Sequence, residues 1–220
     1  IQLGTSNTAT PVNLTSGGGQ IRVYAQVGSG ASQGMANLYN GTVMTWNSGI
    51  GRQDLNILSA STVDNALENW GPFTMTSAAV ADNSTPAIKV VVQETNSSSI
   101  LNPLQNQGYW HKFNATAGGD IDVTITTANT SYYAADRAYK MQFAATTGAI
   151  RTNFGTGLNL AYATSTDSII FGADGTDVTT SSSNITLSGN NFVDNVNAGS
   201  VIFKTSGSAT IQPSLTSGTF

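Results

Sequence analysis

The sequence predicts an all-β protein, an antiparallel β-sandwich of the immunoglobulin-like, pilin-like or jelly-roll type with at most one short helix. Two observations predict this class. Apolar residues alternate with polar ones in many short runs, as in antiparallel strands that place one face on a core and the other in solvent. Between these runs lie clusters of Gly, Asn, Ser and Asp, which are typical of turns. Many short strands separated by such turns are typical of sandwiches and barrels.

The alternation is clearest in Gly119–Thr126, where three branched aliphatic residues fall on one face and Asp120 and Asp122 on the other, solvent-facing side. Runs of this kind recur along the chain, at Gln20–Val27, Ile88–Gln93, Gly119–Thr126, Tyr139–Phe143, Leu158–Tyr162, Ser168–Phe171, Ile185–Leu187, Val201–Phe203 and Ala209–Ile211. Their apolar faces are expected to form the core. The expected core residues are Ile21, Val23, Val90, Val92, Ile121, Val123, Ile125, Tyr139, Met141, Phe143 and Leu160.

One segment has the pattern of a helix rather than of a strand. In Thr62–Trp70, Val63, Leu67 and Trp70 share one helical face. Ser61 followed by Asp64 resembles a capping box, and Gly71-Pro72 would end the helix. The other segments between the alternating runs are expected to be turns. They are Ser16–Gly19, Gly28–Gly34, Ala117–Gly119, Asp174–Asp177, Gly189–Asn191 and Ser206–Ser208.

The chain has very little charge, since only 9% of its 220 residues are Asp, Glu, Lys or Arg, against about a quarter in an average soluble domain. Ser, Thr and Asn take their place, which favours a durable, secreted, extracellular protein at a cell surface. Eight scattered Lys and Arg and a pI near 4.6 exclude a nucleic-acid footprint. The absence of Cys excludes disulfides and thiolate chemistry. No apolar run is long enough to span a membrane, and a start at Ile1 is expected to be the mature end left by a signal peptidase.

The N-terminus is the most suggestive segment for function. Residues 1–15 read as an arm, joined to a single β-sandwich domain at 16–220. Either this arm is an ordinary first strand, or it is a donor strand that completes the sheet of a neighbouring subunit. In the second interpretation the donor-strand residues are Ile1, Leu3, Val12 and Leu14. The hinge residues are Gly17, Gly18 and Gly19.

No pattern of residues predicts an enzyme, a metal site or a cofactor. Gly30–Gly34 matches the nucleophile-elbow pattern around Ser32, but it sits in a flexible Gly/Ser stretch instead of a strand–turn–helix. His111 is the single histidine and has no marked catalytic partners. Asp174 and Asp177, with Asp167 upstream, lack the remaining ligands of a calcium loop. Five aromatic residues are the candidates for a sugar-stacking platform, namely Trp46, Trp70, Trp110, Tyr132 and Tyr133.

Seven Asn-X-Ser/Thr sequons are candidate sites for N-linked glycans, slightly more than chance predicts in a chain so rich in Asn, Ser and Thr. They matter only if the source glycosylates secreted proteins. The candidate glycosylation residues are Asn13, Asn40, Asn83, Asn96, Asn114, Asn129 and Asn184.

The terminal arm, the all-β body and the uncharged surface with its sequons together make the chain resemble subunits of filaments built by donor-strand exchange. These are the chaperone–usher pilins and the β-sandwich subunits of archaeal threads. The chain departs from most pilins in lacking a Cys pair and in being longer. The resemblance implies a head-to-tail homopolymer, a pilus or thread that acts in cell adhesion and biofilm formation. Two alternatives stay open: a virion capsid or surface-layer shell protein with a jelly-roll fold, and a secreted carbohydrate-binding domain.

Overall fold

Twenty β-strands and no helix make up the part of the chain that the computed structural model describes. The described residues are 11–30, 34–37, 43–62, 64–69, 71–80, 85–99, 103–106, 113–132, 135–136, 141–145, 148–155, 158–159, 168–171, 185–189, 192–193, 200–203 and 209–213. Every strand pairing among them is parallel. The chain winds as a β-solenoid of seven turns, here called rungs. Each of the first six rungs supplies one strand to each of three sheets in succession, and the seventh supplies strands to the first two sheets within the described residues.

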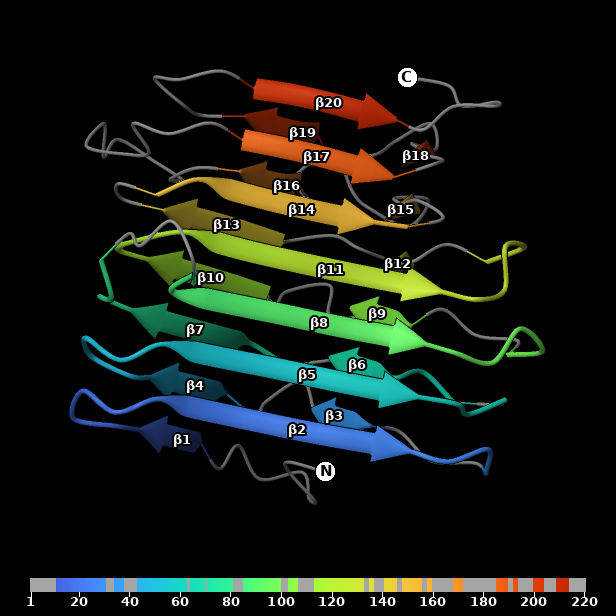
Figure 1. The fold of residues 1–220 in the computed structure, drawn as a ribbon, viewed down its shortest axis with the longest axis horizontal. Coiled ribbons are helices and arrows are strands. Elements are labelled where there is room, and N and C mark those ends of the chain that lie inside the picture. Colours follow the sequence, from blue (N-terminus) through green and yellow to red (C-terminus); the bar gives the residue numbers. More distant parts are fainter. Residues whose placement is uncertain are drawn as a thin grey trace.

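Figure 1 shows the rungs stacked in chain order, from the blue N-terminal strands to the red C-terminal ones. The first sheet contains β1 (Val12–Thr15), β4 (Met44–Asn47), β7 (Phe73–Ser77), β10 (Phe113–Ala117), β13 (Met141–Ala145), β16 (Ser168–Phe171) and β19 (Ser200–Phe203). The second contains β2 (Ile21–Val27), β5 (Gln53–Ser59), β8 (Ile88–Glu94), β11 (Ile121–Thr127), β14 (Ile150–Phe154), β17 (Ile185–Gly189) and β20 (Ala209–Pro213). The third contains β3 (Met35–Asn37), β6 (Leu67–Asn69), β9 (Leu104–Asn106), β12 (Ala135–Asp136), β15 (Leu158–Asn159) and β18 (Phe192–Val193).

The expected antiparallel sandwich, in its immunoglobulin-like, pilin-like or jelly-roll form, is therefore wrong, although the all-β class is right. Alternation with period two is the same in parallel and antiparallel strands. Parallel sheets are usually buried on both faces, but in a solenoid each sheet turns one face to the interior and one to solvent, so alternation persists. Short corners also imitate hairpin loops. Five residues separate β1 from β2, and five separate β4 from β5.

The expected helix over Thr62–Trp70 is also wrong, because Leu67–Asn69 is strand β6. The hydrogen bond that suggested a cap does exist, since the Asp64 N–H donates to Ser61 Oγ at 3.1 Å. It belongs to the turn that leads into β6. Leu67 pairs in register with Leu104 of the next rung, so its burial comes from stacking between rungs.

The core is a set of rows that run along the solenoid, because residues paired in register place their side chains one above another. In the second sheet one inner row is Val23, Leu55, Val90, Val123 and Thr152. The first sheet faces this row with aromatic and sulfur-containing side chains. Among them are Trp46 and Phe73, which pack edge to face with their ring centroids 5.0 Å apart. The expected core is confirmed at Ile21, Val90, Val92, Ile121, Val123, Ile125 and Phe143, and Val23 packs against it partly buried. Met141 lies in β13, and Tyr139 and Leu160 lie outside the described residues.

The first corner, between the first and second sheets, is a stack of small residues. Gly51 lies so close to the backbone of Gly19 in the preceding rung that a Cβ would overlap the Gly19 carbonyl. A Cβ on Gly118 would come within 2.9 Å of the Ala79 carbonyl oxygen. Hydroxyl groups tie this stack together, since Ser48 Oγ and Ser77 Oγ, from successive rungs, both donate to the Gly51 carbonyl at 2.6 Å.

The second corner, between the second and third sheets, repeats one hydrogen-bonded turn in three rungs. In each of them a side-chain oxygen accepts a hydrogen bond from the backbone N–H two residues later. The Ser61 N–H donates to Ser59 Oγ, the Asn96 N–H to Glu94 Oε1 and the Asn129 N–H to Thr127 Oγ1. The amides of two stacked asparagines then bridge rungs. Asn96 Nδ2 donates to the Ala60 carbonyl at 3.2 Å, and Asn129 Nδ2 to the Ser99 carbonyl at 2.8 Å.

Replacing Gly51 with Ala tests the first corner. We expect Gly51→Ala to lower the free energy of unfolding by about 1–3 kcal/mol, because the new methyl group meets rigid backbone. Gly17→Ala is the matched control, since a Cβ there has nothing within 4 Å and Ala restricts the unfolded chain. Urea denaturation followed by circular dichroism measures both. Equal stability of the two variants would contradict the stacked corner.

Candidate functional site

The outer face of the second sheet holds a row of five charged side chains of alternating sign on successive strands. Its members occupy successive strands in register: Arg22, Asp54, Lys89, Asp122 and Arg151. Neighbouring parallel strands lie about 4.8 Å apart, so each charge has an opposite charge beside it. Opposite charges across strands stabilise a sheet, whereas like charges at this spacing would repel. The row continues toward the C-terminus with the uncharged Thr186 and Thr210.

At the C-terminal end of this row the charges are joined directly. Arg151 Nη2 donates to Asp120 Oδ2 at 2.6 Å, and Arg151 Nε donates to Asp122 Oδ1 at 2.8 Å. Asp120 Oδ1 also accepts the Ala149 N–H at 2.8 Å. Burial alone would lower the pKa of Arg151, but the hydrogen bond to Asp120 and the charge of Asp122 raise it overall. The expectation that Asp120 faces solvent is wrong, since it is buried where the first corner enters β11.

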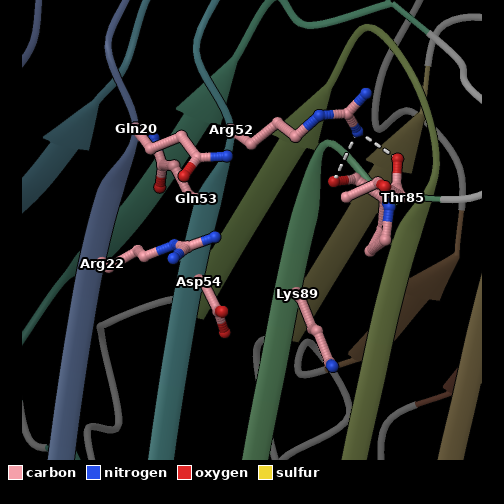
Figure 2. A pocket seen from close by; sticks show the side chains of 8 residues that line it. Gln20, Arg22, Arg52, Gln53, Asp54, Thr85 and Lys89 are labelled. Carbon is pink, nitrogen blue, oxygen red and sulfur yellow. Dashed lines mark hydrogen bonds between the residues drawn. The ribbon is translucent and has the colours of Figure 1, made fainter.

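At the N-terminal end the row borders a shallow depression, shown in Figure 2. Arg22 from β2, Asp54 from β5 and Lys89 from β8 lie along its floor. Arg52 crosses the depression before β5 begins, and its guanidinium donates to the backbone carbonyls of Thr85 and Pro86, the latter at 2.9 Å. Arg22 and Lys89 are exposed, and Asp54 between them is half-buried.

An exposed tyrosine continues this surface along β2. Tyr24 follows Arg22 on the outer face and is 70% exposed, far more than most aromatic side chains. Its hydroxyl group accepts a hydrogen bond from Asn56 Nδ2 at 3.0 Å, and Asn56 lies directly opposite it on β5. The ring is therefore held by its far end while its apolar part stays open to solvent.

Sequence reasoning missed these residues. The alternation in Gln20–Val27 predicts a strand and places Arg22 and Tyr24 on its polar face. Their neighbours Asp54, Asn56 and Lys89 come from rungs more than 30 residues away. The pairing register that brings these residues together leaves no repeated motif in the sequence. Only the recurrence of turn clusters near the first corner hints at a common period.

Several sequence candidates lie outside the described residues: Ser32, His111, Asp167, Asp174, Asp177, Trp70, Trp110 and Tyr133. Of the expected sugar-stacking aromatics, Trp46 is completely buried against Phe73, so it belongs to the core. Tyr132 is half-buried beside the turn at Asn129. The structure therefore does not bring these two aromatics together as a platform.

The expected donor strand lies partly in the solenoid. Val12 and Leu14 are in β1, which pairs with β4 of the same chain, and Leu14 is 36% exposed. Ile1 and Leu3 lie outside the described residues. Gly17, Gly18 and Gly19 form the first-corner turn. Gly18 has a φ of 125°, in the region that favours glycine, and Ser16 Oγ closes the turn on the Gly19 carbonyl at 2.8 Å.

The sequons fall in different environments. Asn13 is exposed on β1, and Asn114 lies in β10. Asn96 and Asn129 are half-buried, and the nitrogen to which a glycan would be attached is the one that bonds to the preceding rung in each. Asn40, Asn83 and Asn184 lie outside the described residues.

One buried carboxyl group stands apart from the charge row. Glu94 ends β8 on the inner face and is 3% exposed. Its Oε1 accepts the Asn96 N–H at 2.9 Å, while Oε2 has no hydrogen-bond partner within the described residues. Burial raises the pKa of Glu94, and the bonds from Asn96 and Ser59 only partly offset this. Glu94 therefore closes the second-corner turn of its rung through its bond to the Asn96 N–H.

Among the residues that the structure describes, no group of three or more His, Asp or Glu is placed to hold a metal ion. No helix there is long and apolar enough to cross a membrane. Comparison with protein-family models, curated proteins and solved structures gave no match to this chain. The class that can be stated is structural: a three-sheet parallel β-solenoid with a charge row on one outer face.

Replacing Glu94 with Gln tests the second corner. A carboxyl group whose pKa is raised by folding destabilises the protein when ionised, and the cost disappears as pH falls through the raised pKa. We therefore expect Glu94→Gln, which keeps the Oε1 acceptor, to raise Tm at pH 7 by about 2–4 °C, the shift that 1 kcal/mol produces at this size. The difference from wild type should shrink between pH 7 and pH 4. A lower Tm for the variant at pH 7, measured by calorimetry, would contradict this assignment.

Proposed function

We propose that this chain is a non-enzymatic structural segment of an extracellular surface filament, in which solenoids add end to end as a homopolymer. The single observation that supports this most is the open edge of its first rung. β1 and β2 each have a strand neighbour on one side only among the described residues. An unpaired strand edge presents backbone donors and acceptors to an incoming strand.

The direction of the backbone groups identifies which residues form this edge. The N–H groups of Val12 and Ile21 donate to the neighbouring rung, at 2.9 and 3.0 Å. Successive N–H groups of a strand point alternately to its two sides. Those of Asn13 on β1 and of Gln26 on β2 therefore point to the open edge. Strand addition there replaces the route first expected, an arm inserted into the groove of a sandwich.

The outer surface also suits a persistent external fibre. Its second-sheet charges are mostly matched by neighbours in register, so few net charges remain to repel a second copy. Seven strands at about 4.8 Å spacing make a rod about 30 Å long, which polymerisation would extend without a change in width. Adhesion and biofilm formation are the roles that such a filament would have at a cell surface.

The test removes the N–H groups of the open edge and keeps the sheets intact. We expect the wild-type chain to form rods of constant width in negative-stain microscopy, and a mass that rises with concentration in light scattering. The double variant Asn13→Pro and Gln26→Pro should stay monomeric, because proline has no N–H and is tolerated on edge strands.

The matched control is Asn13→Ala with Gln26→Ala, which removes the same side chains and keeps both N–H groups. It should polymerise as the wild type does, and all three proteins should share one circular dichroism spectrum. A wild-type chain that is monomeric at high concentration would refute the proposal. Polymerisation of the proline variant would refute strand addition at this edge.

A further inference from the structure

The outer face of the first sheet has a regular array of short, uncharged polar residues, here called the threonine face. These residues alternate along the strands with fully buried core residues such as Trp46 and Phe73. Strand pairing aligns them in two rows across β1, β4, β7 and β10. One row is Asn13, Thr45, Thr74 and Asn114, and the other is Thr15, Asn47, Thr76 and Thr116. None of these eight residues is charged, and five are threonine.

The threonine face differs from the other outer face of the solenoid. On β1, β4 and β7 all six of its residues reach the surface, either exposed or half-buried, and the two residues of β10 continue the rows by register. On the second sheet, by contrast, the oppositely charged Arg22 and Asp54 lie on neighbouring strands, beside the large and 70% exposed Tyr24. Either kind of face keeps a sheet wet. The uniformity of the threonine face is therefore not a requirement of folding.

The threonine face is also held rigid. Threonine is branched at Cβ, so its χ1 angle is restricted and its hydroxyl and methyl groups have few alternative positions. Beneath the face, the completely buried Trp46 and Phe73 pack edge to face and hold β4 and β7 in place. Asn47 is oriented by its own turn, since its Oδ1 accepts the Gly49 N–H at 3.0 Å. A surface that is ordered in advance loses little conformational entropy when a ligand binds.

The spacing of the two rows indicates what kind of ligand fits them. Neighbours within a row lie about 4.8 Å apart, and the two rows, which are two residues apart along each strand, lie about 7 Å apart. Oxygen atoms on the prism planes of hexagonal ice repeat at distances close to both. Water molecules held between hydroxyl groups bond almost as well as a direct partner does. Without charges in the array, no tightly bound hydration shell competes with water ordered on this grid.

We propose that the threonine face binds ice. Its hydroxyl and amide groups bond to an ordered layer of water that joins the crystal, and the threonine methyl groups lie in the spaces between these waters. A long or charged side chain on the face would hold water in a shell that does not match the crystal. The activity belongs to a single solenoid and does not depend on end-to-end assembly, although assembly would repeat the face along the rod.

The test is ice-affinity partitioning of the full chain, produced without glycans because Asn13 and Asn114 belong to sequons. An ice front is grown slowly through the solution, and the fraction of protein in the ice is compared with that of a dissolved dye, which ice excludes. We expect the wild type to be enriched in the ice relative to the dye. Thr74→Lys should lower this fraction at least about fivefold, because its ammonium group would have to lose its hydration at the ice surface.

Thr124→Lys is the matched control, because Thr124 is a half-buried threonine in the middle of a strand on the outer face of the second sheet. It should enter the ice as the wild type does, and circular dichroism should show that all variants are folded. Thr45→Lys, in the same row, takes the place of Thr74→Lys if that variant does not fold.

The proposal is overturned if the wild type enters the ice no more than the dye does, or if the lysine on the second sheet lowers the fraction as much as the lysine on the first. It is also overturned if Thr74→Lys lowers the mass measured by light scattering and leaves the fraction in the ice unchanged. That result would make the threonine face a contact between copies of the chain.

Discussion

The close stacking of successive rungs at the first corner is the constraint on which the rest of the structure depends. Strands of one sheet stay in register only if the chain turns at the same place in every rung. Gly51 fits against the Gly19 carbonyl because it has no side chain, and Gly118 fits in the same way against Ala79. Ser77 Oγ then bonds across the rungs to the Gly51 carbonyl. A larger residue at this corner would push apart every pair of strands above and below it.

Register turns individual residues into rows, and rows have different physical requirements on the two faces. On the inner face a row can be almost uniform, as in Ile57, Val92 and Ile125, because aliphatic side chains pack well on their own kind. On the outer face a uniform row of charge would be strongly unfavourable at 4.8 Å spacing. The alternation of Arg22, Asp54 and Lys89 satisfies this requirement. The next outer row of the second sheet satisfies it without charge, with Tyr24, Asn56, Val91, Thr124 and Asn153.

The sequence predicted the parts of the fold that depend on a single strand. The inner faces of β2, β8 and β11 follow from period two alone, and their buried residues were assigned correctly. The direction of pairing was not predictable in this way, since it depends on which strands meet. Partners in register are separated by as few as 23 positions, from Ala135 to Leu158, and by as many as 40, from Phe73 to Phe113. Such irregular rungs hide the repeat, and their short corners resemble hairpins. The candidate site was hidden for the same reason, because Tyr24 and Asn56 are neighbours only through register.

The charge row also bears on how two copies would meet in the end-to-end assembly proposed above. An incoming strand beside β2 would be placed in line with Arg22. The position in this row on the last strand of the second sheet, β20, is Thr210, which follows Thr186 in register. A neutral residue there can lie beside Arg22 without repulsion, whereas a row that ended in a cation would oppose the contact. The alternating charges thus end at Arg151 on β14. The open edge of β2 would meet β20 of the next copy, whose residue in this row is the uncharged Thr210.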